Sequence, residues 1–213
     1  MTNADYQQIF HEIKNYITFI NSSLQLVEKM HPEIREYPYW HNSMQELDSL
    51  KRMLLELNSA RLNTELCLES ISLDTFLADL VNSCTAAFHS EEFQIKTDIS
   101  SQLPKLSADP ERLKRALSNL IKNAYEAMSG KGTVLMSASL EQDYIRLDIT
   151  DFGGGIPEDY LPELFTPFKT TKQGGTGLGL LIARQIIETH KGHILVDSRP
   201  KDGCTFSVCL PAH

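Results

Sequence analysis

The chain has 213 residues, of which 41% are hydrophobic and 23% charged, and its formal net charge is −8, as expected for a globular protein with one large domain or two modest ones. The acidic balance leaves no basic surplus to displace phosphate counterions, so we expect no nucleic-acid partner. No apolar run approaches the roughly 18 residues of a membrane span, and the first residues, MTNADYQQ, lack the regions of a signal peptide, so we expect a cytoplasmic chain with no membrane segment.

Two long amphipathic helices are predicted at the beginning of the chain. Apolar residues recur at alternating three- and four-residue steps from about Asp5 to Met30, and a second helix is predicted from about Tyr39 to Leu66, with narrow, coiled-coil-like seams. His31-Pro32 separates the two, because proline disfavours helix at the residue before it. The seam residues are Ile9, Ile13, Ile17, Ile20, Leu24 and Val27, then Met44, Leu47, Leu50, Leu54 and Leu57. One hairpin cannot bury both faces of its seam, so we expect a homodimer in which two chains form a four-helix bundle.

The remainder of the chain mixes helices with strands. The patterns predict helices at about residues 74–88, 109–128 and 177–190, and strands at 93–99, 133–140, 144–150, 193–198 and 205–210. This mixture is typical of an α/β sandwich, in which helices cover one face of a sheet. We therefore predict an α+β chain, with a helical hairpin domain at residues 1–68 and an α/β domain at residues 69–213. The loop-like segment 152–175 is long for a compact domain, which indicates a functional loop such as an active-site lid.

The helix at residues 109–128 has the strongest local signals. Asp109 followed by Pro110 favours a helix start, because the carboxylate can accept from first-turn N–H groups and proline lacks a donor that would go unpaired there. The predicted buried stripe is Leu113, Ala116, Leu117, Leu120, Ile121, Ala124 and Ala127. Asn119 and Asn123 lie one turn apart at its edge, where two carboxamide oxygens could bind a hard cation such as Mg²⁺. On this helix alone, two ordinary border asparagines are the more common arrangement.

Two glycine-rich segments follow this helix. Asp151 ends a strand and precedes Phe152-Gly153-Gly154-Gly155, so its carboxylate could accept from an exocyclic amine while the backbone lies close to a flat ring. A plain glycine turn is the alternative. Gly175-Thr176-Gly177-Leu178-Gly179 opens a helix, and its N–H groups suit a phosphate chain at the positive helix end. Leu180 stands where a Rossmann fingerprint has its third glycine, and no Walker loop occurs.

Together these segments resemble a known family. Asn119-x-x-x-Asn123, Asp151-x-Gly153-x-Gly155, Phe165-x-x-Phe168 and Gly175-x-Gly177-x-Gly179 occur in the order of the N, G1, F and G2 boxes of the Bergerat ATP-binding fold, which includes gyrase-type ATPases and sensor histidine kinases. The stretches NLIKNAYEAM, LFTPFKTTK and GGTGLGLLIARQII resemble the histidine kinases in particular. Gyrase-type members have a water-activating glutamate where Asn119 stands, and its loss fits an enzyme that transfers phosphate instead of hydrolysing ATP.

The resemblance implies a role for each matching residue around the base and the metal. Asp151 would bind the adenine amine, and Gly153 and Gly155 would pass close to the adenine ring. Asn123, with Asn119 beside it, would hold Mg²⁺. Phe152 departs from the small polar residue that is usual in the family, so a change in packing at the adenine edge is possible while the carboxylate is kept.

The resemblance also implies a phosphate site and a lid. The residues around the phosphates would be Gly175, Thr176, Gly177, Leu178 and Gly179. Lys169 and Lys172 would be the cations that approach the β- and γ-phosphates, with a solvated lid face as the alternative for either. Phe165 and Phe168 would anchor the lid in the core.

The first helix contains a segment, Phe10-His11-Glu12-Ile13-Lys14-Asn15, that resembles the H box of the histidine kinases. The resemblance makes His11 the phosphoacceptor. Glu12 can accept one ring N–H and leave the other nitrogen nucleophilic, and Asn15, one turn on, could orient a water. Tyr16 stands where the family often has a helix-kinking proline. The histidines that we expect to be exposed and inert are His31, His41, His89, His190 and His193.

The function predicted from the resemblance is that of a two-component histidine kinase core. The γ-phosphoryl group of ATP would pass to His11 and then to an aspartate in the receiver domain of a response regulator, and the protein could also act as a phosphatase on that regulator. Two alternatives stay open: a phosphotransfer or scaffold dimer with a degenerate ATP-binding domain, and a Bergerat-fold ATPase or serine kinase.

Overall fold

The computed structural model of the chain separates into two compact units. It describes residues 3–61, 66–88, 90–100, 103–170, 172 and 175–212, and of residues 3–9, 11 and 55–61 it describes the backbone alone. One unit comprises Met1–Leu62 and Thr170–Leu178, and the other Asn63–Lys169 and Gly179–His213. The domain boundary placed at residue 68 from the sequence stays a prediction.

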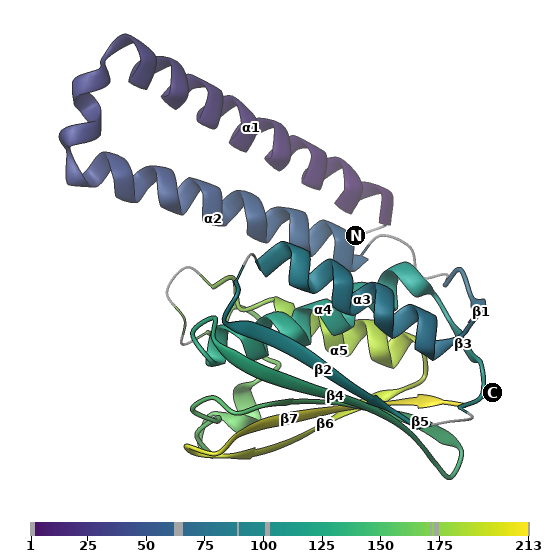
Figure 1. Ribbon diagram of the computed structural model, residues 1–213. Helices are drawn as coiled ribbons and strands as arrows, with labels where there is room; N and C mark the ends of the chain where they lie inside the picture. Colours follow the sequence, from purple (N-terminus) through teal and green to yellow (C-terminus); the bar gives the residue numbers. More distant parts are fainter. Residues whose placement is uncertain are drawn as a thin grey trace. The chain divides into compact units, whose positions relative to one another are not determined.

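A helical hairpin makes up most of the first unit (Figure 1). Helix α1 spans Asn3–Met30, the 3-10 helix η1 spans Pro32–Glu36, and α2 spans Pro38–Arg61. The predicted end of the second helix at Leu66 is wrong, because α2 ends at Arg61 and Leu66 lies outside any helix. In the part of the chain that the structure describes, no helix combines the length and the apolar character needed to cross a membrane.

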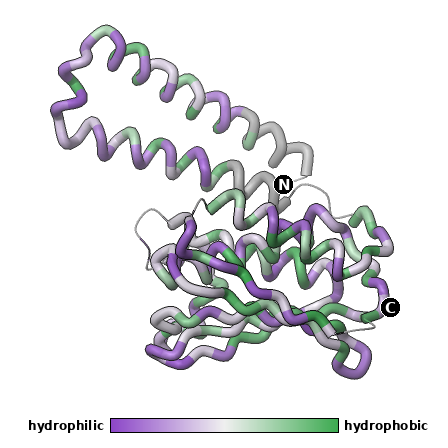
Figure 2. Tube along the Cα trace, viewed as in Figure 1, coloured by the Kyte–Doolittle hydropathy of each residue, from purple (hydrophilic) through white to green (hydrophobic). Residues whose placement is uncertain are grey.

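The second unit is an α/β sandwich, which confirms the predicted fold class (Figure 1). Its five-stranded sheet has the order β2-β4-β5-β7-β6, with β2 parallel to β4 and the other neighbours antiparallel. The strands are β2 Phe93–Ile99, β4 Gly132–Glu141, β5 Tyr144–Asp151, β6 His193–Arg199 and β7 Gly203–Pro211. Helices α3 Leu73–Phe88, α4 Pro110–Ala127 and α5 Gly179–Thr189 cover one face of this sheet. Figure 2 shows hydrophobic positions concentrated along these strands and helices, where the core forms.

Helix α4 is fixed by the signals that the sequence indicated. The Asp109 side chain accepts a hydrogen bond from the Arg112 N–H at 3.1 Å, and Pro110 occupies the first turn. The buried residues of the helix are Leu113, Ala116, Leu117, Leu120, Ile121 and Ala124. Ala127, the last member of the predicted stripe, is exposed, so the buried stripe ends one turn before the helix does.

A small second sheet was absent from the sequence prediction. Strand β1, Glu69–Ile71, pairs antiparallel with β3, Leu106–Ala108, so that Glu69 faces Ala108. Three-residue strands are too short to produce a recognisable alternation. The segment 152–175, predicted as a loop, contains the 3-10 helix η2, Leu161–Glu163.

Candidate active site

The middle of α4 lies against the first residue of α5. The Asn119 side chain donates a hydrogen bond from Nδ2 to the Gly179 carbonyl oxygen at 3.2 Å. A Cβ added to Gly179 would be 3.9 Å from Asn119 Cγ, which is ordinary contact. The residue pair therefore joins two sequence blocks, the asparagine motif and the end of the second glycine-rich segment, that are far apart along the chain.

The last turn of α4 lies against the first glycine-rich segment. A Cβ on Gly153 would be 2.7 Å from the Ala127 carbonyl oxygen, too close for any side chain. Asn123 is half-buried and lies one turn after Asn119 and one turn before Ala127. The contacts at Gly179 and Gly153 therefore flank Asn123, so that residues from three separate motifs gather along one stretch of α4.

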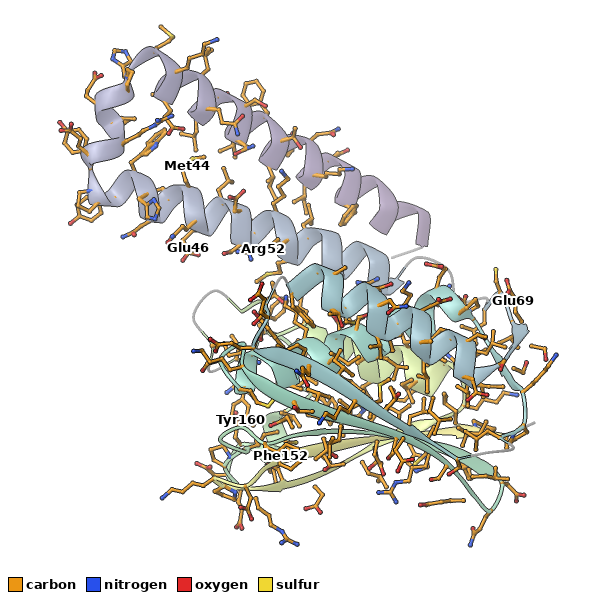
Figure 3. The ribbon with its side chains drawn as sticks, in the orientation of Figure 1. Met44, Glu46, Arg52, Glu69, Phe152 and Tyr160 are labelled. Carbon is orange, nitrogen blue, oxygen red and sulfur yellow. The ribbon has the colours of Figure 1, made fainter. Side chains whose placement is uncertain are left out.

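Asp151 provides the buried carboxylate of this site. It ends β5 with 3% exposure, and its Oδ1 accepts a hydrogen bond from the Gly153 N–H at 2.9 Å. The following residue, Phe152, is 58% exposed (Figure 3). Because side chains alternate along β5 and Asp151 lies on its buried side, Phe152 follows on the opposite side. The predicted influence of Phe152 on packing at an adenine edge stays a prediction.

Gly155 after Asp151 and Gly203 in the β6–β7 turn are both required by close packing of the backbone. Gly155 has a φ of 67°, and a Cβ on it would clash with the Arg199 carbonyl group. Gly203 has a φ of 107°, and a Cβ there would clash with the Asp151 carbonyl oxygen. The Lys201 N–H donates to the Gly154 carbonyl oxygen at 2.8 Å. Close approach between protein segments thus accounts for Gly155 before any ligand is considered.

The segment that precedes Thr170 carries one of the two predicted lid cations. Lys169 Nζ lies 3.0 Å from Glu163 Oε2, with both side chains about half exposed. Phe168 is 54% exposed and has a φ of 64°, so its predicted place in the core is wrong. Phe165 is half-buried, and the Arg184 guanidinium lies over its ring at 5.3 Å from the centroid. Phe165 is therefore held by a cation–π contact with α5.

Threonine side chains accept backbone hydrogen bonds within the second glycine-rich segment and just before it. Thr170 Oγ1 accepts from the Lys172 N–H at 3.1 Å, and a Cβ on Gly175 would be 2.7 Å from the same oxygen. Thr176 Oγ1 accepts from the Leu178 N–H at 3.4 Å, Leu178 is buried, and Gly177 has a φ of 66°. Lys172 is exposed.

The H-box residues lie on α1. The His11 backbone is helical, but its side chain lies outside the described part of the structure, as does its predicted contact with Glu12. Glu12 and Asn15 are exposed, whereas the neighbouring Phe10 is buried.

His190 is a residue whose environment the sequence did not reveal. It is 7% exposed, which contradicts the prediction of an exposed histidine. Its Nε2 accepts a hydrogen bond from the Asp109 N–H at 3.0 Å, and its Nδ1 lies 2.8 Å from the Ile186 carbonyl oxygen. A histidine directly after a predicted helix gives no local sign of such a partner, because Asp109 is distant in the sequence.

The cysteine thiols should differ in reactivity. Burial, followed by the negative charge of Asp151, raises the pKa of Cys204 to about 12, whereas Cys67 is exposed. Since the thiolate is the nucleophile, Cys204 should stay neutral and unreactive at about pH 8, far below its raised pKa. We expect iodoacetamide to modify Cys67 in the folded protein and Cys204 only after denaturation, as read by mass spectrometry. Modification of native Cys204 as fast as Cys67 would contradict its burial.

Comparison with known proteins places the second unit in a defined class. Residues 108–213 match the family model of histidine kinase-, DNA gyrase B- and HSP90-like ATPases. The sensor histidine kinase ZraS of Escherichia coli (strain K12) is 34% identical over 206 residues, which cover 96% of this chain and 44% of ZraS. Sporulation kinase E of Bacillus subtilis (strain 168) is 31% identical over 204 residues, 95% of this chain and 28% of that protein. The chain thus spans less than half the length of these curated relatives.

Among the solved structures that are similar to this chain are histidine kinases. The catalytic domain of histidine kinase ThkA is 30% identical with a TM-score of 0.57, over 68% of this chain and 95% of the ThkA chain. Full-length ShkA, solved in complex with AMPPNP, has a TM-score of 0.78 over 99% of this chain and 46% of the ShkA chain, and at 24% identity it shares the fold. The chain belongs to the histidine kinase family, and its residues 108–213 form the ATP-binding domain of that family.

Proposed function

We propose that this chain is the core of an ATP-dependent protein-histidine kinase, in which the γ-phosphoryl group of ATP is transferred to His11. The observation that carries the proposal is the gathering of motifs along α4. Asn119 bonds to the Gly179 carbonyl group, Gly153 packs against Ala127, and Asn123 lies between these contacts. The alternative of a degenerate ATP-binding domain is weakened by two of these residues: Gly153 packs too closely against Ala127 for any side chain, and Asn119 uses its amide to donate to the Gly179 carbonyl oxygen.

Asp151 is proposed to recognise adenine. A buried carboxylate at a strand end, oriented by the Gly153 N–H, is an acceptor-only group of the kind that suits an exocyclic amine. A hydrogen bond to a charged acceptor is stronger than one to a neutral group. Guanine presents a carbonyl oxygen instead of this amine, so the site favours adenine.

Asn119 and Asn123 are proposed to hold Mg²⁺. Both are half-buried, and Asn119 uses Nδ2 for its bond to Gly179, so its carbonyl oxygen remains the atom suited to a hard cation. Among the described residues, no group of three His, Cys, Asp or Glu side chains forms a competing metal site. When bound, Mg²⁺ would neutralise charge on the phosphates.

The phosphate groups are assigned to the segment Gly175, Thr176, Gly177, Leu178 and Gly179. The last of these residues begins α5, whose positive end favours anions. Lys169 and Lys172 are the proposed cations of this site. The exposed ion pair of Lys169 with Glu163 is worth up to about 1 kcal/mol, so triphosphate can compete for that lysine at small cost.

The transfer itself is an in-line displacement. One ring nitrogen of His11 forms a bond to the γ-phosphorus while the bond from that phosphorus to the bridging oxygen breaks, which releases ADP. Glu12 accepts the proton from the other ring nitrogen. The phosphoryl group then passes to an aspartate carboxylate in the receiver domain of a response regulator. The nitrogen–phosphorus bond breaks and Glu12 returns its proton to the ring, which restores neutral His11.

The same hairpin is proposed to form the homodimer. Ile17 is buried within the chain, whereas Ile13, Ile20 and Val27, spaced seven residues apart on the same helix, are 42%, 46% and 39% exposed. A seven-residue apolar repeat is the signature of helix packing, and a second copy of the hairpin would cover this row.

Incubation with γ-labelled ATP and Mg²⁺, followed by mapping of the labelled residue, tests the proposal. Acid-labile label on His11 is expected. Acid-stable label would indicate a serine kinase, release of phosphate without label would indicate an ATPase, and absence of both would favour a phosphotransfer or scaffold dimer.

Asn15 is expected to be required for removing phosphate from the regulator and dispensable for phosphorylation of His11. Asn15 is exposed and one turn after His11 on α1, where its carboxamide can orient a water towards an aspartyl phosphate. Asn15→Ala should therefore lower dephosphorylation while autophosphorylation stays near the wild-type rate. The two reactions are assayed separately, and equal loss of both would indicate a structural defect, whereas unchanged dephosphorylation would assign the water to another group.

A further inference from the structure

The chain that follows α2 is fastened to the ATP-binding domain by Asp109. The Cys67 N–H donates a hydrogen bond to Asp109 Oδ2 at 3.1 Å. Strand β1 begins directly afterwards at Glu69, labelled in Figure 3, which pairs with Ala108, the residue before Asp109. This linker, residues 66–71, is thus held at the same point by a carboxylate and by a backbone ladder (Figure 1).

The same carboxylate begins α4. Asp109 Oδ1 accepts from the Arg112 N–H at 3.1 Å, and Arg112 Nε lies 3.4 Å from Oδ2. Asp109 as a whole is 6% exposed. Oδ1 therefore contacts the helix, and Oδ2 contacts both the linker and Arg112, so that one buried carboxylate connects the linker to the start of α4.

His190 joins the end of α5 to the backbone of Asp109. The Ile186 carbonyl oxygen can only accept, so His190 Nδ1, 2.8 Å away, carries the proton. Nε2 is then the acceptor for the Asp109 N–H at 3.0 Å. The other end of α5 is tied to α4 by the bond from Asn119 to Gly179, so this helix is attached at both ends.

We propose that Asp109 and His190 form a joint that couples the linker from the hairpin to both helices of the nucleotide site. Asp109 and His190 are positioning residues. The Asp109 carboxylate holds the linker and so determines how effectively ATP meets His11. His190 holds α5 and so determines the position of the phosphate-binding segment that ends at Gly179. This inference rests on the proposed kinase function. It predicts that the joint has two parts with separate effects: the linker part, at Asp109, affects the rate of phosphorylation, and the α5 part, at His190, affects nucleotide binding.

Asp109→Asn tests the linker part. The variant keeps one carbonyl oxygen for the Arg112 N–H but places an NH₂ group opposite the Cys67 N–H. We expect hydrogen exchange at the Cys67 amide to become about tenfold faster, as loss of a hydrogen bond to a charged group implies. The kcat of autophosphorylation should fall roughly threefold to tenfold, with an unchanged KM for ATP. Glu111→Gln, which removes an equal charge from the exposed first turn of α4, should alter neither quantity.

Substitutions of His190 test the α5 part. His190→Gln keeps an acceptor near the position of Nε2 and should retain wild-type affinity for Mg²⁺–ADP. His190→Leu removes the acceptor and should weaken Mg²⁺–ADP binding about threefold or more. Rescue by glutamine distinguishes positioning from simple loss of volume, and Asp109→Asn keeps the inference testable if the leucine variant does not fold.

The outcomes separate this inference from the proposed function. Faster Cys67 exchange in Asp109→Asn with an unchanged kcat would overturn the role of the linker bond, and equal nucleotide affinity in His190→Gln and His190→Leu would overturn the role of α5. A wild-type protein that forms no phosphohistidine would instead refute the kinase proposal. The ADP-binding comparison would still decide the α5 part of the joint in that case.

Discussion

Replacement of His11 by glutamine is expected to abolish acid-labile phosphorylation while nucleotide affinity and dimerisation stay near wild-type values. Glutamine keeps a polar side chain on α1 but has no ring nitrogen that can attack phosphorus. His11 belongs to one compact unit, whereas Asn119, Asn123 and Asp151 belong to the other, so the proposed adenine and metal groups are untouched. The measurement is the transfer of label from γ-labelled ATP, with binding of Mg²⁺–ADP recorded on the same sample.

His41→Gln is the matched control for this experiment. His41 is an exposed histidine on α2, and its Nε2 lies 2.8 Å from Gln45 Nε2. Its replacement makes the same chemical change on the same hairpin, and phosphorylation should persist. Acid-labile label that remains on the His11→Gln protein would show that another residue is the acceptor.

Asp151→Asn should produce the second large effect, a loss of ATP affinity of about 1.5–3 kcal/mol, or about tenfold to more than a hundredfold. The asparagine carbonyl oxygen can still accept from the Gly153 N–H, so the loop after β5 should keep its shape. What is lost is the charge of the acceptor that is proposed to face the adenine amine. Calorimetric titration with Mg²⁺–ATP measures the change.

Asp148→Asn provides a control on the same strand. Asp148 lies on β5 and pairs with Arg146 Nε at 2.8 Å, away from the glycine-rich segment. Its replacement removes an equal charge and should leave ATP affinity unchanged. Equal competition by GTP and ATP in the wild-type protein would refute the adenine role of Asp151.

The bond from Asn119 to Gly179 also bears on the difference from gyrase-type ATPases. A glutamate in place of Asn119, as those proteins have, could not donate to the Gly179 carbonyl oxygen when ionised and would instead repel it. An asparagine is therefore compatible with this start of α5 for a structural reason. Asn119 thus has two consequences: it places no water-activating base at this position, and it attaches the start of α5 to α4.

The sequence by itself determined the elements whose signals are local. Asp109 and Pro110 identified the start of α4, because a helix cap and its first turn are adjacent in the chain. Strand β2 was predicted with the bounds that it has, since alternation over seven residues sets its inner face. The motifs around Asn123 and Asp151 were recognisable because their residue types and spacing occur within short segments. Their order along the chain was enough to indicate the family.

Only the tertiary structure decided which segments meet. The pairing of β1 with β3 and the burial of His190 against Asp109 depend on partners that are remote in sequence, so no local pattern indicates them. The family resemblance predicted Gly155 beside an adenine ring, and only the structure shows that the Arg199 carbonyl group is its close neighbour. Phe168 was placed in the core because it matches the F box of the family, but in the structure it is 54% exposed and its φ is 64°. Burial and close approach are properties of two segments together, and the sequence describes each segment alone.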